Sequence, residues 1–191
     1  GEGALFLDLS EEEDNYLRNL NQLTAKPRLY MANVGEEDLP HGGDLCGPVA
    51  LLAKQQGAEM VVLCAALEMV LAEWPEEEAN AYRAEVGMQG SGLGILVRAG
   101  YRLLNLITFF TTTGGHEVRA WPLPRGSTAL QAAGEIHTDM ARGFIRAEVI
   151  NYAELAAVGS FATAREQGRL RVAGREYLIQ DGDIIHIRFH V

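Results

Sequence analysis

The stretch Leu29-Tyr30-Met31-Ala32-Asn33-Val34-Gly35-Glu36 decides how the first half of this chain is interpreted. Its first four residues are an apolar run, which predicts a buried strand over residues 28–33. In α/β proteins with parallel strands, ligands bind where the strands end. The amide of Asn33, leaving the strand there, can hydrogen-bond a purine edge, and the ionised carboxylate of Glu36 can only accept hydrogen bonds from a base. The stretch therefore predicts a base-binding loop, although an ordinary polar loop has the same pattern.

A second apolar run supports a parallel sheet. Met60-Val61-Val62-Leu63-Cys64 predicts a strand over residues 59–65, and the intervening segment predicts a helix that begins at Pro48 and ends near Gly57. Strands that are apolar throughout, connected by a helix, are typical of a parallel sheet that is covered on both faces. Three further helices are predicted around these strands, at residues 10–20, 75–87 and 92–104.

After residue 106 the apolar residues alternate, which is the period of strands. The expected order is a hairpin turning at Gly114-Gly115, a helix capped by Ser127, a strand at 143–150 and two short helices. A second hairpin over 170–179 and a terminal strand with Ile185, Ile187 and Phe189 on its inner face complete the pattern. This order is that of a β-grasp, ubiquitin-like fold.

Charge divides the chain in the same place. The net charge is −10, and residues 1–105 contain 7 basic and 17 acidic residues, whereas residues 106–191 contain 9 of each. This step predicts two domains, 1–105 and 106–191, with different partners. Cys46 and Cys64 lack the spacing of a metal or redox motif and are expected to be buried free thiols of a cytoplasmic protein. No apolar run is long enough to span a membrane.

Several segments together resemble the YchF / Obg-like ATPases, a group of P-loop NTPases. Residues 24–36 are similar to the base-recognition strand and loop of that family, and Cys64-Ala65-Ala66-Leu67-Glu68 is similar to its second base-contacting loop, S-A-K-x-E. Residues 131–149 are close to the most recognisable segment of the family, and Asp181-Gly182-Asp183 matches its last loop. The resemblance extends over the whole chain, and its C-terminal part is similar to TGS domains.

The resemblance implies the fold class α/β, with the C-terminal part of a P-loop NTPase domain followed by a β-grasp TGS domain. It implies hydrolysis of ATP with Mg²⁺ and a role as a nucleotide-dependent switch near the ribosome. The base would be contacted by Asn33, Val34 and Glu36, and by the backbone of Cys64 and Ala65. Guanine-binding relatives have Asp at the position of Glu36, so preference for guanine should weaken here, and a GTPase is the alternative.

The chain departs from the family in two ways. Cys64 and Ala66 replace the usual Ser and Lys, so this loop loses its side-chain support for a base. The P-loop pattern Gly-x-x-x-x-Gly-Lys-Ser/Thr is absent, since neither Lys26 nor Lys54 follows it. The P-loop and the Mg²⁺ ligands are therefore expected in a region that precedes this chain. A second hypothesis is a ribosome- or RNA-binding module without catalysis.

All basic residues after residue 106 are arginines, which suit phosphate contacts. Four of them, Arg119, Arg142, Arg146 and Arg188, are candidates for a stripe that binds ribosomal RNA, and ion pairs with Glu117, Glu148 and Asp183 are the alternative. His186 and His190 lie too far apart along a strand to share a metal, and His137 and Asp139 lack a nucleophile. We predict no catalytic residue and no metal site in the chain, and no binding to DNA, because the net charge is negative.

Overall fold

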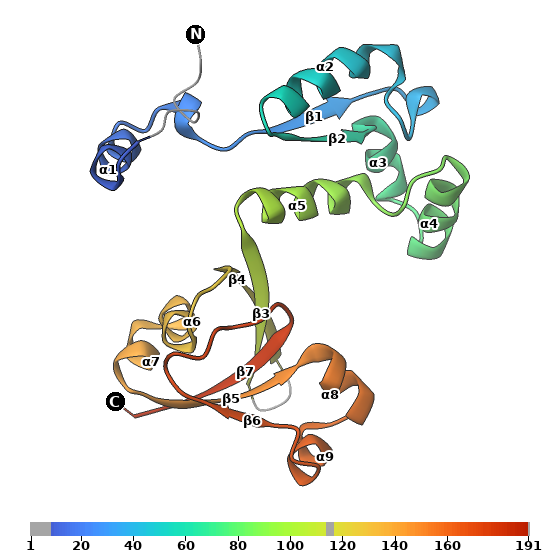
Figure 1. Ribbon diagram of the computed structural model, residues 1–191. Coiled ribbons are helices and arrows are strands. Elements are labelled where there is room, and N and C mark those ends of the chain that lie inside the picture. The colour runs from blue at the N-terminus through green and yellow to red at the C-terminus, as the bar shows by residue number, and fades with distance from the viewer. Residues whose placement is uncertain (1–8, 114–116, 191) are drawn as a thin grey trace. The chain divides into compact units, whose positions relative to one another are not determined.

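The computed structural model describes residues 9–113 and 117–190. The chain divides into two compact units, Gly1–Leu104 and Asn105–Val191. Figure 1 shows the first unit in blue to green and the second in green to red. No helix in the described ranges is long and apolar enough to cross a membrane. Each unit has its own sheet, and each is treated separately below.

The first unit is built on two parallel strands, β1 (Leu29–Asn33) and β2 (Glu59–Leu63), joined through helix α2 (Gly43–Gln55). The register pairs Leu29 with Glu59 and Asn33 with Leu63, so both strands end at the same level. The remaining elements of this unit are α1 (Glu11–Asn19), η2 (Leu23–Ala25), η3 (Glu36–Asp38), α3 (Ala65–Leu71), α4 (Glu76–Glu85) and α5 (Gly92–Leu103). The strand–helix–strand order predicted from the sequence is thus present, with the expected parallel pairing.

Two helices differ from the sequence prediction. Helix α2 begins at Gly43, so Pro48 lies inside the helix and does not start it. Gly42 and Gly43 have φ angles of 95° and 62°, and this left-handed backbone turns the chain into the helix earlier than Pro48 would. Helix α3 was not predicted, because its N-cap is Cys64, whose thiol is a weak capping group that sequence rules do not recognise.

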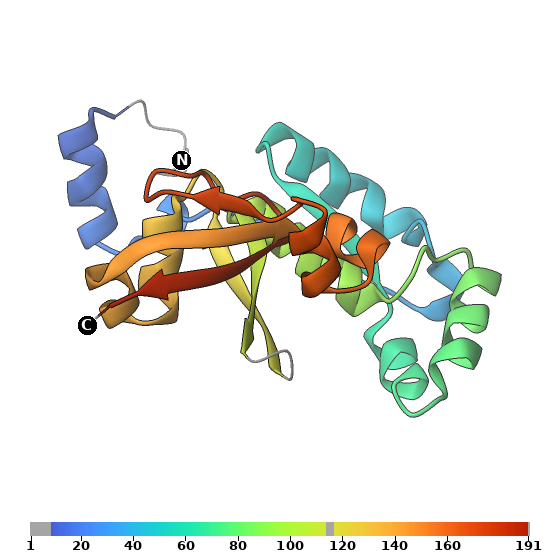
Figure 2. The same ribbon diagram turned by 90° about the horizontal axis from the view of Figure 1, so that it is seen from below.

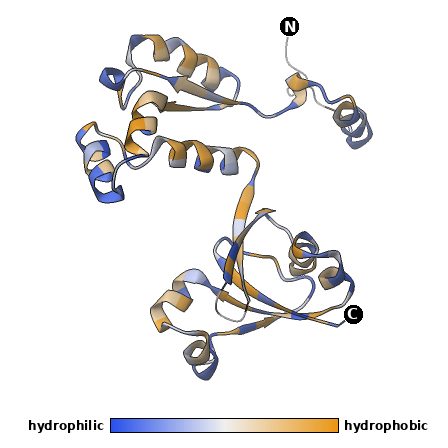
Figure 3. Ribbon diagram, turned by 180° about the vertical axis from the view of Figure 1, so that it is seen from behind, coloured by the Kyte–Doolittle hydropathy of each residue, from blue (hydrophilic) through white to orange (hydrophobic). Residues whose placement is uncertain are grey.

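Apolar side chains of this unit remain exposed in the described structure. On α5, which Figure 3 shows as largely hydrophobic, Leu93 is 61% and Val97 50% exposed. Met31 on β1 is 51% exposed as well. Strand β1 has a single neighbouring strand among the described residues, so its second edge and part of its faces are uncovered. The small residues Gly92 and Ala99 form the buried side of α5.

The second unit contains a five-stranded mixed sheet in the order β4-β3-β7-β5-β6. Strands β3 and β7 are parallel, and the other neighbouring pairs are antiparallel. Its strands are β3 (Leu106–Thr113), β4 (Glu117–Pro124), β5 (Phe144–Asn151), β6 (Arg171–Ala173) and β7 (Asp183–Phe189). Its helices are α6 (Ala129–Ile136), α7 (Thr138–Arg142), α8 (Tyr152–Val158) and α9 (Phe161–Glu166).

Both faces of this sheet carry apolar residues. The larger cluster includes Phe109, Val149 and Ile185 and packs against α6, with Met140 of α7 at its border. The smaller cluster, on Ile150 and Ile184, packs against α8 and α9. Figure 2 shows the two helix pairs beside the sheet strands that they cover. Phe109 is fully buried and its ring stacks on Trp121, with ring centroids 6.4 Å apart.

The sequence prediction was wrong in two details of this unit. Residues 170–179 do not form a hairpin: β6 pairs with β5, and the following segment bonds to the start of α6 through Ala129 N–H to Tyr177 O at 2.8 Å. The cap of α6 is Thr128, whose side chain accepts from Gln131 N–H in a reciprocal capping box, and not Ser127. The turn expected at Gly114-Gly115 lies outside the described residues, while the flanking strands pair as expected.

Tyr177 provides a pH-dependent contribution to the stability of the second unit. Burial and a 2.9 Å hydrogen bond to Asp183 raise the pKa of Tyr177 to about 12, from a usual value of 10.0. Because the fold favours the protonated phenol, its stabilisation is complete below pH 10 and is lost as the pH rises toward 12. We expect the free energy of unfolding to fall over this range, as measured by urea unfolding.

Tyr177→Phe should flatten this alkaline dependence. The control is Tyr152→Phe, which removes a tyrosine that is 63% exposed and should leave the dependence unchanged. Equal slopes for the wild-type protein and Tyr177→Phe would contradict the assignment.

Candidate functional site

The ends of β1 and β2 are joined by the Asn33 side chain. Its Oδ1 accepts a hydrogen bond from Ala65 N–H at 3.0 Å. A backbone N–H can only donate, so this bond identifies the amide atom that faces Ala65 as the oxygen. Val34 N–H donates to Leu63 O at 3.0 Å, which continues the parallel pairing by one residue. The loops after the two strands are therefore held against each other.

A pocket of about 370 Å³ lies beside this junction. It is open to solvent and mostly apolar, a combination typical of small-molecule sites. Its lining comes from the loop after β1, from α3 and the turn that follows it, and from α4: Val34, Gly35, Glu36, Cys64, Ala66, Leu67, Val70, Leu71, Trp74 and Tyr82. Three of the five predicted base-site residues, Val34, Glu36 and Cys64, thus line one pocket, and Asn33 and Ala65 form the hydrogen bond at its edge.

The backbone N–H of Ala65 and the thiol of Cys64 both have partners within the chain. The N–H of Ala65 donates to the Asn33 side chain, so this donor is engaged at the junction of the two loops. The thiol of Cys64 is buried and accepts from Leu67 N–H at 3.5 Å, which caps α3. Both cysteines are buried free thiols, as predicted.

The carboxylate of Glu36 is paired with a residue that sequence reasoning missed. The Tyr82 hydroxyl donates a hydrogen bond to Glu36 Oε1 across the mouth of the pocket. The hydrogen bond and the negative charge of Glu36 raise the pKa of Tyr82. Nothing in the sequence links two residues 46 positions apart, and the sequence predicted only the helix that carries Tyr82.

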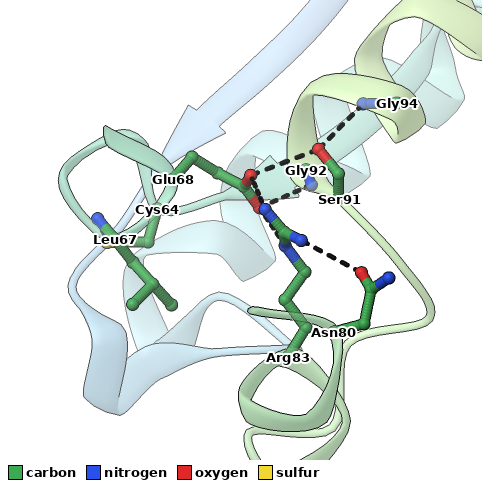
Figure 4. A network of polar contacts seen from close by, with 8 residues as sticks. All are labelled: Cys64, Leu67, Glu68, Asn80, Arg83, Ser91, Gly92 and Gly94. Atoms are coloured by element: carbon green, nitrogen blue, oxygen red, sulfur yellow. Dashed lines mark hydrogen bonds and ion pairs between the residues drawn. The ribbon is translucent and has the colours of Figure 1, made fainter. Parts of the chain in front are cut away.

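Glu68 organises the helices around the pocket (Figure 4). Its carboxylate accepts hydrogen bonds from Arg83 at 3.0 and 3.4 Å, from Gly92 N–H at 2.7 Å and from the Ser91 hydroxyl at 3.2 Å. Arg83 also donates to Asn80 at 3.1 Å. These bonds join α3, which carries Glu68, to α4 and to the first turn of α5.

The ion pair between Glu68 and Arg83 is shielded from water. The two side chains are 15% and 10% exposed. Burial, the largest influence, raises the pKa of Glu68, but the hydrogen bonds from Gly92 and Arg83 and the Arg83 charge outweigh it and leave the pKa below 4.5. The carboxylate is therefore ionised at neutral pH, as the bonds to its oxygens require.

The four candidate arginines of the second unit do not share one face of the sheet. Arg146 and Arg188 are register partners on β5 and β7, so their side chains lie on the same face. Arg119 on β4 is the register partner of Thr111 on β3, and Thr111 is the register partner of the buried Ile185 on β7. Arg119 therefore lies on the face of Ile185, which is opposite to the face of Arg188. Arg142 ends α7.

Carboxylates accompany three of these arginines. Arg119 pairs with Glu117 at 2.7 Å, Arg188 with Glu148 at 3.7 Å, and Arg142 with Asp139 at 3.6 Å. Asp183, expected as an alternative partner, is buried and accepts from Tyr177 and Gln180.

His137 has a structural role in the described unit. Its Nδ1 accepts from Asp139 N–H at 3.1 Å and so caps α7. Within residues 9–113 and 117–190, no three His, Cys, Asp or Glu side chains are grouped so that they could hold a metal ion.

Comparisons with known proteins agree with this architecture. The YchF-GTPase_C family model, described as "Protein of unknown function (DUF933)", matches residues 106–190. The chain is 44% identical over 190 residues to "Ribosome-binding ATPase YchF" of Bacillus subtilis (strain 168), covering 98% of this chain and 52% of the relative. The protein of the same name from Escherichia coli O157:H7 is 43% identical over 185 residues, covering 97% of this chain and 50% of the relative. The chain thus spans about half the length of the curated relatives it matches.

Solved structures give the same result. The structure of the Schizosaccharomyces pombe YchF GTPase superposes with a TM-score of 0.83 at 32% identity, over 96% of this chain and 49% of that one. A GTP-binding protein from Pyrococcus horikoshii OT3 shares the fold, with a TM-score of 0.60 at 19% identity, over 96% of this chain and 58% of that one.

The fold and the pocket define a mixed α/β chain of the kind found in GTP-binding proteins. Within that class, the resemblance to the YchF family is confirmed: it extends over nearly the whole chain, and residues 106–190 carry the family's C-terminal domain.

The buried ion pair gives a test of how the pocket is supported. Glu68→Gln leaves Arg83 without a counter-charge at a site that is 10% exposed, so we expect the free energy of unfolding to fall by about 3 kcal/mol. Since the folded carboxylate has a lowered pKa, the loss should be complete above pH 4.5 and should shrink at lower pH.

The matched control is Glu59→Gln, which breaks the Glu59–Arg102 pair. Those side chains are 39% and 58% exposed, so water screens the pair and the change should cost much less than Glu68→Gln. Chemical denaturation of the full-length protein measures the loss in the free energy of unfolding for both variants. Equal losses would contradict the larger stabilisation assigned to the buried ion pair.

Proposed function

We propose that this chain is the C-terminal half of a YchF-type P-loop ATPase that hydrolyses ATP with Mg²⁺ and acts as a ribosome-associated switch. One observation carries the proposal: the Asn33 amide, fixed by Ala65, lies beside a pocket that also contains the carboxylate of Glu36. This arrangement offers donors and an acceptor to the edge of a purine. The relatives named ribosome-binding ATPases support the rest of the assignment.

The proposed roles of the site residues follow from their positions. Asn33 donates through Nδ2 to the base, and Val34 and the apolar wall of the pocket pack on it. Glu36 accepts from a base amine and disfavours guanine. Cys64 and Ala65 hold the loop, through the cap on α3 and the hydrogen bond to Asn33.

The phosphate-binding half of the site is proposed to belong to another part of the protein. A two-stranded sheet is marginal by itself, and apolar residues of β1 and α5 are exposed, as they would be if further strands of an NTPase domain packed there. The Mg²⁺ ligands are assigned to the same part, because the Mg²⁺ of a P-loop NTPase is held by the P-loop hydroxyl and by the nucleotide phosphates.

The second unit is proposed to be a β-grasp TGS domain that contacts ribosomal RNA or protein in the cytoplasm. Its strand order supports this proposal, because the first and last strands of the unit pair in parallel inside the sheet, as the β-grasp fold requires. Arg146 and Arg188 are adjacent on one face, and Arg142 is 77% exposed at its side chain. These arginines are the proposed phosphate contacts, and Arg119 would contribute only from the opposite face.

A second candidate is a ribosome- or RNA-binding module without turnover. The specific observation in its favour is the distribution of charge. The exposed arginines lie in the second unit, whose charges balance, whereas the pocket lies in the first unit, which is acidic. This hypothesis predicts that nucleotide does not change ribosome association.

Base preference tests the enzyme hypothesis against a GTP-preferring GTPase. Glu36→Asp shortens the carboxylate and restores the residue of the guanine-binding relatives, so the ratio of kcat/KM for ATP to that for GTP should fall about ten-fold. Steady-state phosphate release by the full-length protein measures this ratio. The control is Glu37→Asp, a neighbouring exposed carboxylate that does not line the pocket. An unchanged ratio would favour the GTPase alternative.

Ribosome binding tests the role of the second unit. Each phosphate contact adds to the salt dependence of binding, so reversing the charge of Arg142 and Arg146 to Glu should weaken cosedimentation with ribosomes and lower its salt dependence. Reversal of Arg171, which pairs with Glu154 at 2.8 Å on edge strand β6, is the control. If binding is unaffected by the double reversal, the proposed contact is elsewhere.

A further inference from the structure

Tyr82 connects the wall of the pocket to the carboxylate of Glu36. Its ring packs against the buried cluster formed by Cys64, Leu67, Leu71 and Ala79. Trp74 meets the same ring edge-on, with centroids 5.7 Å apart and planes at 67°. The hydroxyl at the tip of this anchored ring donates to Glu36 Oε1. The phenol is therefore positioned by the apolar core, while its polar end acts inside the pocket.

The position of Tyr82 is fixed from a second side by its neighbour in sequence. Arg83 is held by Glu68, which also holds the first turn of α5. Helix α4 therefore cannot shift relative to α3 without breaking a buried ion pair. The loop that carries Glu36 is exposed, so the Tyr82 hydroxyl is the rigid partner and Glu36 the adaptable one.

The chemistry of the bases makes this contact relevant to selectivity. Guanine presents its N1–H and its 2-amino group side by side, and this pair of donors matches the two oxygens of a free carboxylate. Adenine has no such pair and presents a single amino group. A carboxylate that accepts a hydrogen bond from a phenol is oriented toward the phenol. One lone pair of its Oε1 is then occupied by the phenol hydrogen. The carboxylate can then serve one donor well and a forked pair poorly.

We propose that Tyr82 is a specificity-positioning residue, which holds Glu36 in an orientation that accepts a single base amine and rejects the paired donors of guanine. The inference rests on the proposed nucleotide site and goes beyond it, because it assigns selectivity to a residue outside the two base-recognition loops. The raised pKa of Tyr82 supports the geometry, since the phenol remains a donor throughout the physiological pH range.

The test uses the full-length protein and three nucleotides: ATP, GTP and ITP. Hypoxanthine, the base of ITP, keeps the N1–H of guanine but lacks the 2-amino group. In the wild-type protein GTP and ITP should bind about equally, because the second donor is not used. In Tyr82→Phe the carboxylate is released, and GTP should gain about five-fold over both ITP and ATP in dissociation constants measured by calorimetry.

The control is Tyr30→Phe, which removes a hydroxyl that donates to Gln56 at 2.7 Å, outside the pocket. It should leave all three affinities in their wild-type ratios. A Tyr82→Phe protein in which the three affinities change by one common factor would overturn the proposal, since Tyr82 would then only support the fold. Unchanged affinities would also overturn it. If the wild-type protein binds none of the three nucleotides, the proposed function itself fails, which is a distinguishable result.

Discussion

The buried carboxylate of Glu68 is the interaction on which the first unit depends. It accepts two hydrogen bonds from Arg83 of α4, one from the Ser91 hydroxyl and one from Gly92 N–H, and the last of these donors, in the first turn of α5, has no partner within its own helix. A charge at such a site is tolerable only because Arg83 and the N–H of Gly92 replace the water it has lost. The network therefore sets the spacing of α3, α4 and α5, and with it the shape of the pocket that α3 and α4 line.

The pocket shows how one sequence position can act through another. Asn33 is placed by the end of β1, but the direction of its amide is fixed by Ala65 at the start of α3. Glu36 is placed by a loop, but its carboxylate is held by Tyr82 of α4. Loops that bind ligands need such support, because a side chain that is free to rotate selects poorly among similar bases. The apolar cluster below Tyr82 supplies rigidity, and the exposed loop supplies access.

The sequence predicted the elements whose signals are local. The apolar periodicity predicted the paired strands. The helix expected from residue 10 is present, and it begins with a capping box in which Ser10 N–H donates to Glu13 at 2.9 Å. The hairpin predicted at 170–179 does not form, because its second half is hydrogen-bonded to the start of α6. That contact depends on the tertiary fold and has no local signal in the sequence. Tyr82 and Arg83 were missed for a related reason: their partners lie on other elements, and no spacing rule reports them.

The central claim is that the ends of β1 and β2 with α3 and α4 form a site for the base of ATP. A crystal structure of the full-length protein with a bound ATP analogue tests it most directly. We expect adenine to fill the pocket between Val34 and Trp74, with its amino group near Glu36 and with Tyr82 still donating to that carboxylate. An adenine ring bound elsewhere, with this pocket empty, would contradict the proposed base site.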